Sequence, residues 1–307
     1  MKVLVIGSAV IDIVANIEEN VQEKNFLKFL IGSKYNLNVF RFEIGGSAVN
    51  VASTLSRLGC SSYVLSKVGN DQFSKKILNF LKKENVKTKY IKKEKTLTDF
   101  SIVLMQRGER TILVSHTASK KFSKNDIKEK ILKNFDFVIS TSIFSNEAKE
   151  IYMKISEVCE KNKINFVFNP SITVLRKFDL ENVFGKIIIL NEEEAKCLTK
   201  EKSIKNAGKK LLKNFEIVII TLGEKGSILF KDNLKIFQKA FKVNLVSTLG
   251  AGDSFTAGFV YWYGKTRKLD ESLKFATSTA AINLLDTSPI PNIKSEKDVL
   301  DFLNYYV

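Results

Sequence analysis

Short, continuous apolar runs alternate with longer segments of helical period over most of the chain. The run Lys2–Gly7 is typical of a parallel strand that is buried on both faces. From Ser123 onward strands and helices alternate regularly, which predicts an α/β fold with a doubly wound, mostly parallel sheet flanked by helices. The strands expected in this part are 135–139, 164–168, 186–190 and 216–221, with a hairpin of 228–230 and 234–237, and the expected helices are 123–134 (opened by a Ser123/Asp126 capping box), 146–162, 192–198, 203–214, 253–263, 269–285 and 295–305.

The first 120 residues follow a different pattern. Residues 11–17 and 38–44 alternate between apolar and polar side chains, and residues 98–105 and 111–115 flank the turn sequence Arg107-Gly-Glu-Arg110. Because no helix follows these strands, we expect a second, small antiparallel sheet, formed from about 12–18, 36–44 and 98–117. The elements expected beside it are a short helix over 21–29, a helix over 47–58, a strand over 62–68 and a helix capped by Asp71.

Composition limits the classes of protein to be considered. A chain of 307 residues without internal repeats or a linker fits one α/β domain, 1–307. Its formal net charge is +16, yet the excess is lysine scattered along the predicted helices. The densest cluster, Lys82–Lys95, has almost no interleaved aromatic residues. We therefore expect a solvated lysine surface that attracts anionic substrates such as nucleotides, and no dedicated nucleic-acid site.

Cysteine and histidine are both scarce. The three cysteines lack the spacing of a metal site and fit a reducing cytosol. The apolar start, 3–6, is too short for a signal sequence, and no run approaches the ~20 apolar residues of a membrane span. We expect a cytoplasmic protein with no membrane partner. A single histidine, His116, excludes a histidine-based metal site and is expected in a loop or strand.

The stretch Ser247–Val260 carries the chemistry expected of this fold. Gly250, Ala251 and Gly252 precede a good helical run, and glycines there let a ligand approach the backbone. The helix would present free N–H groups and the positive end of its dipole, which is an anion site. Asp253 stands beside that site, where a carboxylate can deprotonate a hydroxyl during phosphoryl transfer. The alternative is a glycine turn with Asp253 as the helix N-cap.

Two features in the first part of the chain could hold a substrate. The sequence Gly45-Gly46-Ser-Ala-Val-Asn50 joins a strand to a helix, and the Asn50 amide could bond hydroxyl groups. Its alternative is a tight turn with a solvated Asn50. Asp12 could accept two hydrogen bonds from the vicinal hydroxyls of a sugar, or it could be an ordinary surface residue.

Two further features could hold a nucleotide. Asn191 follows a buried strand and Glu194 lies one helical turn later, which suits water-mediated contacts to Mg²⁺ and phosphate. An acidic first helical turn, which the helix dipole favours, is the alternative. Thr221, Gly223 and Gly226 follow the next strand and could present amides to a nucleotide or simply form a hairpin turn. Neither a Walker A sequence nor G-x-G-x-x-G after the first strand is present.

In combination these motifs resemble those of the ribokinase-like (PfkB) sugar and nucleoside kinases, over essentially the full length. The first family signature resembles Gly45-Gly46 to Asn50 with Ala52, Gly59 and Gly69, and the second resembles Thr248–Asp253 with Ala257-Gly258. The resemblance implies ATP- and Mg²⁺-dependent phosphorylation of a hydroxymethyl group, with the small sheet as a lid and, in many members, a homodimer surface. The resemblance also implies the roles of single residues. Asp253 would be the base, the anion hole would be formed by Gly250, Ala251 and Gly252, and the substrate would be bound by Asp12, Gly45, Gly46 and Asn50. The Mg²⁺–phosphate site would be served by Asn191 and Glu194, with Glu194 at the metal, and the nucleotide would be lined by Thr221, Gly223, Gly226 and Asn283.

The chain departs from the family pattern at four places. Ser247 replaces an aspartate that helps many members to hold a monovalent cation, so potassium activation is not expected here. Ser47 replaces a lysine of ribokinases proper, Ser115–Ala118 replaces a Gly-Ala-Asn-like stretch, and Leu284–Pro289 lacks the usual glycine. These changes concern the substrate and the cation and leave the Asp253 chemistry intact.

The leading hypothesis is therefore an ATP-dependent kinase that phosphorylates a sugar or a sugar-like small molecule. The alternative is an adenosine-type nucleoside kinase, with a base held by Phe40, Phe42 or Phe100, although sheet packing explains these residues equally well. A sensor of nucleotides or sugars that lacks catalysis disagrees with the intact Asp253 motif. A dehydrogenase disagrees with the missing dinucleotide fingerprint.

Overall fold

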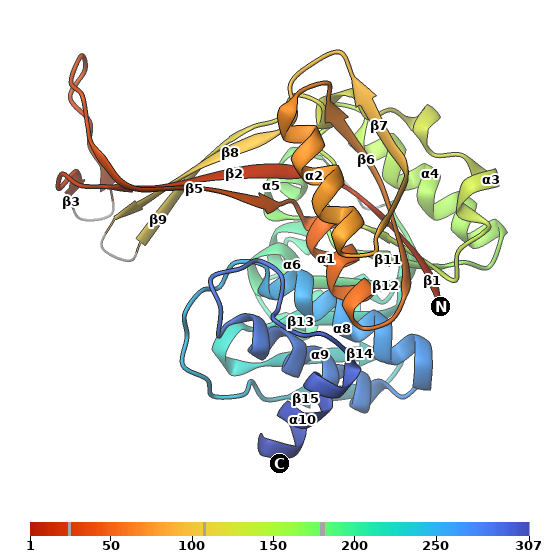
Figure 1. The fold of residues 1–307 in the computed structure, drawn as a ribbon. Helices are drawn as coiled ribbons and strands as arrows, with labels where there is room; N and C mark the ends of the chain where they lie inside the picture. Colours follow the sequence, from red (N-terminus) through yellow and green to blue (C-terminus); the bar gives the residue numbers. More distant parts are fainter. Residues whose placement is uncertain (24–25, 107–108, 179–181, 307) are drawn as a thin grey trace.

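The computed structural model describes residues 1–23, 26–106, 109–178 and 182–306, and its centre is a sheet between two layers of helices (Figure 1). The nine strands of this sheet within the described residues have the order β15-β14-β13-β12-β11-β10-β1-β6-β7. All neighbours from β13 to β7 are parallel, and β14 and β15 are added antiparallel. The strands are β1 (Lys2–Ile6), β6 (Ser61–Gly69), β7 (Lys87–Glu94), β10 (Phe137–Ser140), β11 (Asn165–Phe168), β12 (Gly185–Asn191), β13 (Phe215–Thr221), β14 (Ser227–Lys231) and β15 (Leu234–Gln238).

The two helical layers follow from the alternation of side chains along each strand. In β1, Val3 and Val5 face one core, whereas Leu4 and Ile6 face the other, and all four are fully buried. The first core is covered by α1 (Ser47–Arg57), α2 (Gln72–Lys83), α8 (Ala251–Thr266) and α9 (Leu269–Asn283). The second core is covered by α3 (Glu129–Leu132), α4 (Ala148–Lys161), α5 (Ile172–Lys177), α6 (Glu192–Thr199) and α7 (Ile204–Leu211), while α10 (Glu296–Tyr306) packs on α9. The expected doubly wound architecture is confirmed.

A second sheet extends from the main sheet as a long arm, which we call the lid (Figure 1). Its order is β5-β2-β8-β9, formed by β2 (Val10–Ile17), β5 (Leu37–Gly45), β8 (Phe100–Gln106) and β9 (Glu109–Ser115). The outer pairs β2–β5 and β8–β9 are antiparallel, as expected, but the central pair β2–β8 is parallel. This difference has a topological cause, because β2 and β8 both run outward from the main sheet and β5 and β9 return.

The prediction of a helix over residues 21–29 is wrong. The described part of this segment forms a two-stranded antiparallel ribbon, β3 (Gln22–Glu23) and β4 (Phe26–Leu27). The Lys28 N–H donates to the Val21 carbonyl within this segment, and the Val21 N–H ties it to the lid by donating to Gln106 Oε1 at 2.9 Å. Tertiary hydrogen bonds thus outweigh the weak helical pattern.

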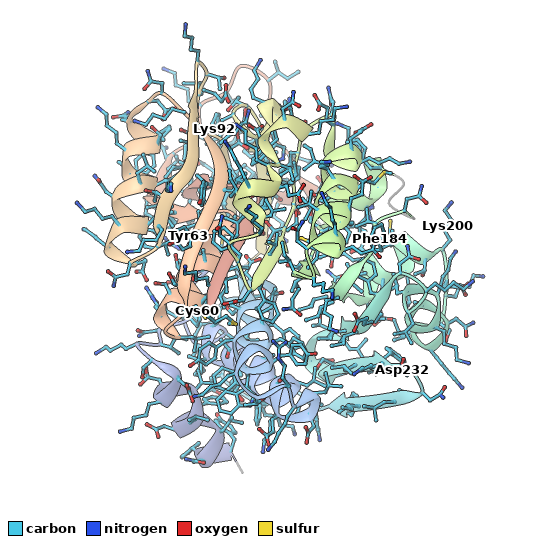
Figure 2. The ribbon with its side chains drawn as sticks, turned by 90° about the vertical axis from the view of Figure 1, so that its right-hand side faces the viewer. Cys60, Tyr63, Lys92, Phe184, Lys200 and Asp232 are labelled. Carbon is cyan, nitrogen blue, oxygen red and sulfur yellow. The ribbon has the colours of Figure 1, made fainter. Side chains whose placement is uncertain are left out.

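Three other elements differ from expectation. The strand β7 was not expected, because four of its eight residues are lysine; it forms the edge of the main sheet, where lysines prevent pairing with another chain. Figure 2 shows Lys92 of β7 and Tyr63 of the neighbouring β6. The capping box of Ser123 and Asp126 is present, but it begins the 3₁₀ turn η2 (Lys124–Asp126), and only α3 follows as helix. The short helix α5 was also not expected.

In the part of the chain that the structure describes, no helix combines the length and apolar character needed to cross a bilayer. The three cysteines are free, and Cys60 and Cys159 are buried. Burial raises the pKa of both thiols to about 12, so neither is a reactive thiolate.

Candidate active site

The bend before α8 is built so that only glycine fits. Gly250 is the N-cap of α8 and has a left-handed backbone, with φ 77°. A Cβ atom placed there would lie 1.9 Å from the carbonyl oxygen of Pro289. At Gly252, by contrast, a Cβ would meet no described atom within 4 Å, so the space before the helix is open. The Ala251 N–H lies 3.5 Å from the Thr248 carbonyl oxygen, and the open space at Gly252 is where an anion could approach the N-terminus of α8.

Asp253 lies in the first turn of α8, three residues after the N-cap. The alternative in which Asp253 itself caps the helix is thus wrong. Its Oδ2 accepts a hydrogen bond from Asn50 Nδ2 at 2.8 Å, across the packed helices α1 and α8. Burial raises the pKa of Asp253 to about 6, against opposing hydrogen bonds from Asn50 and Ser47. A partly exposed carboxylate with this pKa is ionised near pH 7 and still a competent base.

Asn50 has an unused acceptor. Its side chain is only 5% exposed, and its Nδ2 is engaged with Asp253. Within the described residues its Oδ1 has no hydrogen-bond partner. A buried acceptor without a donor is costly, so this oxygen suits a hydroxyl group of a bound molecule.

The two glycines that precede α1 make close contacts with the protein itself. A Cβ at Gly45 would lie 2.3 Å from Asp12 Oδ2, and a Cβ at Gly46 would lie 2.6 Å from the Ser8 carbonyl oxygen. Gly46 is also the N-cap of α1, with φ 94°. These glycines therefore place Asp12 and the beginning of α1 side by side.

Asp12 occupies the base of the lid. It lies on β2, opposite Glu43 of β5 and Ser101 of β8, and the Ser101 hydroxyl donates to its carboxylate. Burial raises the pKa of Asp12, the Ser101 hydrogen bond opposes this, and the charge of Glu43 raises it further. The structure thus brings Asp12 to the same strand–helix junction as Gly45, Gly46 and Asn50.

Asn191 and Glu194 form a reciprocal capping box at the start of α6. The Glu194 N–H donates to Asn191 Oδ1 and the Asn191 N–H donates to Glu194 Oε2, both at 2.8 Å. Burial raises the pKa of Glu194; hydrogen bonds from the Asn191 and Ile172 N–H groups lower it, while the charges of Glu193 and Asp253 raise it. Glu194 and Asp253 therefore share one electrostatic environment. No group of three or more His, Cys, Asp or Glu side chains in the described ranges could enclose a metal ion by itself.

The Thr221–Gly226 segment is the turn between the antiparallel strands β13 and β14, and it contains the 3₁₀ turn η3 (Gly223–Lys225). Gly223 and Gly226 have positive φ, 60° and 112°, and a Cβ at Gly226 would lie 2.0 Å from the Gln238 carbonyl oxygen. The turn thus needs both glycines for its own geometry. Thr221 ends β13 directly beside Asn191 of β12.

Asn283 is fully buried at the end of α9. Its Nδ2 donates to the Ser288 carbonyl at 3.0 Å, and the next residue, Pro289, contacts Gly250. In this structure Asn283 supports the 284–289 loop, which packs against the glycine bend before α8.

Three exposed apolar residues near this loop were missed by sequence analysis. Leu245, Val246 and Leu285 are 62%, 56% and 43% exposed, and the Val246 N–H donates to the Leu284 carbonyl. Such an exposed apolar strip suits the flat ring of a nucleotide. No periodic signal marks these residues, because they lie in irregular segments.

A broad hollow of about 1300 Å³ lies elsewhere, near Phe184, Lys213 and Asp232. Phe184 and Asp232 are labelled on that side of the molecule in Figure 2. This hollow borders the beginnings of β11, β12 and β13, whereas Asn191 and Thr221 lie at the ends of their strands. In parallel α/β sheets ligands bind outside the carboxyl ends of the strands, so we place the candidate site at the edge with Asn191 and Thr221 and not at this hollow.

Comparison with known structures defines the fold. The chain superposes on adenosine kinase from Sinorhizobium meliloti with a TM-score of 0.82, covering 98% of each chain at 21% identity. It superposes on ribokinase from Thermotoga maritima with a TM-score of 0.79, covering 98% of this chain and 99% of that one at 22% identity. The fold is ribokinase-like.

The family follows from the sequence. The model of the pfkB family of carbohydrate kinases matches residues 1–296, and the chain belongs to this family. It is 25% identical to ribokinase from Haemophilus influenzae over 276 residues, covering 87% of this chain and 89% of that protein. The protein is thus a phosphotransferase of the sugar and nucleoside kinase class.

Proposed function

We propose that this kinase transfers the γ-phosphoryl group of ATP to a hydroxymethyl group of a sugar or sugar-like small molecule, with Asp253 as the general base. One observation carries the proposal: a carboxylate with a pKa of about 6 stands in the first helical turn after a glycine bend and is held by Asn50. A base beside an anion hole is the arrangement that phosphoryl transfer to an alcohol needs.

Each residue of the substrate site then has a defined task. Asp12 and the free Oδ1 of Asn50 accept hydrogen bonds from substrate hydroxyls, while Gly45 and Gly46 keep these two side chains close together. The reacting hydroxyl lies at Asp253, which removes its proton as the new O–P bond forms and the bond to ADP breaks. The N–H groups of the Gly250-Ala251-Gly252 segment stabilise charge on the transferring group.

The residues also fit a Mg²⁺–ATP complex. Glu194 and Asp253 repel each other, and a cation near them would relieve that repulsion. Mg²⁺ commonly uses one or two carboxylates together with waters and phosphate oxygens, so a cage of protein ligands is not needed. Mg²⁺ would neutralise phosphate charge. We assign Glu194 and Asn191 to this site, Thr221, Gly223 and Gly226 to the nucleotide, and Asn283 to support of the nucleotide loop.

The neutral Ser247 points to turnover without potassium activation. Its hydroxyl accepts a hydrogen bond from the Leu249 N–H at 3.2 Å, and it brings no charge for a monovalent cation. Turnover in sodium-free buffer with and without K⁺ tests this point. A several-fold increase with K⁺ would contradict it.

The direct test of the proposed function is ADP release with Mg²⁺–ATP and a panel of sugars and nucleosides. Turnover with at least one neutral sugar, and its loss in Asp253→Asn, is the expected result. Turnover with nucleosides alone would establish the alternative, a nucleoside kinase. Of the aromatic residues considered for that alternative, Phe42 packs on Phe73 and under Lys76, and the side chain of Phe40 lies outside the described residues.

We also propose that the lid forms a homodimer. The edge strand β9 exposes three consecutive apolar residues, Ile112, Leu113 and Val114, at 43%, 54% and 50%. Leu37 and Phe42 on the other edge strand are also exposed, at 47% and 44%. Exposed apolar edge strands of this kind commonly mark an association surface. We expect light scattering to show a dimer for the wild type and a monomer for Leu113→Lys. A wild-type protein that is already monomeric would overturn this proposal.

A further inference from the structure

The register of the lid strands places His116 on the same sheet face as Asp12. Asp12 pairs with Ser101 of β8, which pairs with Val114 of β9. Side chains that are directly opposite share a face, and so do residues two apart on one strand. His116 follows Val114 by two residues and comes directly after Ser115, the inner end of β9 where the lid joins the body. The alternation of β9, continued by one residue, places the imidazole at the base of the lid on the face that carries Asp12.

The imidazole is held in place from two directions. Its Nδ1 lies 3.4 Å from Asp99 Oδ2, and the Asp99 side chain is only 1% exposed. The N–H groups of Thr117 and Ser119 fix that carboxylate, at 2.9 and 3.0 Å. One face of the imidazole stacks on Phe144, with ring centroids 3.6 Å apart and planes 16° apart.

The loop that carries Phe144 is fixed as well. The Ile143 N–H donates to the Tyr152 hydroxyl at 2.7 Å, and the Ser145 hydroxyl donates to the Phe122 carbonyl. The imidazole still retains 19% exposure. A partly exposed ring with so many supports is preorganised for contact with a ligand.

The charged side chains on this face disfavour ligands that carry an anionic group. Asp12 and Glu43 place two carboxyl groups on this face, and Asp99 adds a third negative charge from its buried position beside the imidazole. Arg41, on the same face of β5, is paired with Glu43. The other buried cation nearby, Lys67, is paired with Glu94 and Asp126 at 2.9 and 3.0 Å. An anionic group on the substrate would meet carboxylates here and no unpaired lysine or arginine among these described side chains.

We propose that His116 is a specificity residue that contacts a hydroxyl group of a neutral, polyhydroxylated substrate, at the end away from the phosphorylated hydroxymethyl group. The inference rests on the proposed kinase function and narrows its substrate to neutral sugars or nucleosides, in contrast to sugar phosphates and sugar acids. With Nδ1–H directed to Asp99, Nε2 is an acceptor for the substrate hydroxyl. Asp12 supplies a second acceptor on the same face.

Two experiments test the proposal. The first compares kcat/KM for fructose, ribose and adenosine with that for fructose 6-phosphate and gluconate, all with Mg²⁺–ATP. We expect at least one neutral compound to exceed both anions by about 10-fold or more, because the carboxylates of the lid repel a negatively charged substrate. An anionic sugar that is the better substrate would overturn the inference and leave the kinase function intact. No turnover with any compound, nucleosides included, would overturn the kinase function itself.

The second experiment uses His116→Ala, with Ser115→Ala as the matched control. Ser115 is the adjacent residue and lies on the opposite face of β9. We expect His116→Ala to raise KM for the preferred substrate about 5- to 20-fold, the size of one lost hydrogen bond, with kcat changed less than 2-fold. Phe144→Leu, which keeps the imidazole but removes its stacking partner, should raise KM less. Equal KM values for His116→Ala, Ser115→Ala and wild type, each with an unchanged melting temperature, would overturn the role of His116.

Discussion

The catalytic edge of the main sheet and the lid are built in opposite ways. At the catalytic edge, α1 and α8 lie against the core, and Ala48, Val49, Ala257 and Phe259 are fully buried. Gly46 and Gly250 there touch backbone atoms so closely that no larger residue fits. Along the outer lid strand, by contrast, about half of the surface of Ile112, Leu113 and Val114 is exposed. Substitutions on the lid surface should therefore disturb packing less than substitutions beside Gly46 and Gly250.

We expect this difference to divide the proposed site into residues that act on the phosphoryl transfer and residues that select the substrate. The groups that would carry phosphoryl transfer, Asp253 and the α8 N-terminus, belong to the rigid body. The groups that would select the substrate, Asp12, Ser101 and His116, belong to the lid or its base. Changes in the body should therefore lower kcat, whereas changes in the lid should mainly raise KM.

The largest effect is expected for Asp253→Asn. The amide keeps the shape of the carboxylate but cannot take a proton, so turnover should fall by ~10²–10⁴-fold, the usual contribution of a general base. Single-turnover kinetics with Mg²⁺–ATP and the preferred substrate measures this loss. A melting temperature near that of the wild type serves as the folding control, and near-normal turnover would refute the role of Asp253.

The next largest effect is expected for Gly250→Ala. The new Cβ would lie 1.9 Å from the Pro289 carbonyl oxygen and would sit on a left-handed residue, which costs about 1–2 kcal/mol before any clash. The bend must shift, so turnover should fall about 10²-fold, as when an oxyanion-hole donor is lost, and the melting temperature should fall too.

Gly252→Ala is the matched control for that variant. The new methyl group at Gly252 would have no described atom within 4 Å, so the variant should melt like the wild type. Because Gly252 belongs to the same proposed anion hole, it is a control for stability only. If Gly250→Ala melted at the same temperature as Gly252→Ala, the tight contact with Pro289 would not determine the shape of the bend.

A smaller effect, visible in the pH profile, is expected for Asn50→Ala. The base works when ionised, so kcat/KM of the wild type should fall as the pH drops below the Asp253 pKa of about 6. The Asn50 amide stabilises the ionised form, and its removal raises that pKa. The acid limb of the profile should therefore move to higher pH. Ser53→Ala on the same helix should leave the limb in place, and an unmoved limb in Asn50→Ala would contradict the coupling.

The sequence indicated the glycine bend before α8 and its neighbours more directly than the pairing of the lid strands. Glycines, a strand–helix junction and an acidic residue are local signals, so the positions of Gly250, Asp253 and Asn50 could be found without coordinates. The contact between Asn50 and Asp253 spans 203 residues and no local pattern encodes it. The contact of Asn283 was harder still to predict from the sequence, because its side chain bonds the Ser288 carbonyl and only the next residue, Pro289, reaches Gly250.

In the lid, local sequence patterns predict the strands, but they do not predict which strands pair or in which direction. The parallel alignment of β2 with β8 places Ser101 beside Asp12, and neither segment alone indicates it. The ribbon of β3 and β4 depends on the bond between Val21 and Gln106, and β7 depends on its place at the edge of the main sheet. For the same reason His116 gave only the expectation of a loop or strand residue; its stacking partner Phe144 lies 28 positions away, in another segment.

The smallest effect is expected for Ser101→Ala, which changes the lid and leaves the body untouched. Its hydroxyl donates to Asp12 and lowers the Asp12 pKa against the effects of burial and Glu43. Without this donor the Asp12 pKa rises, and the carboxylate loses a bond that fixes it for the substrate hydroxyls. KM should rise about 3- to 5-fold, more at the acidic end of the pH range than at the alkaline end, with kcat unchanged, since one hydrogen bond is worth about 1 kcal/mol. Ile102→Val, on the opposite lid face, should leave both constants unchanged. A fall in kcat with constant KM would instead mean that the lid takes part in the chemical step, and the separation between lid and body would be wrong.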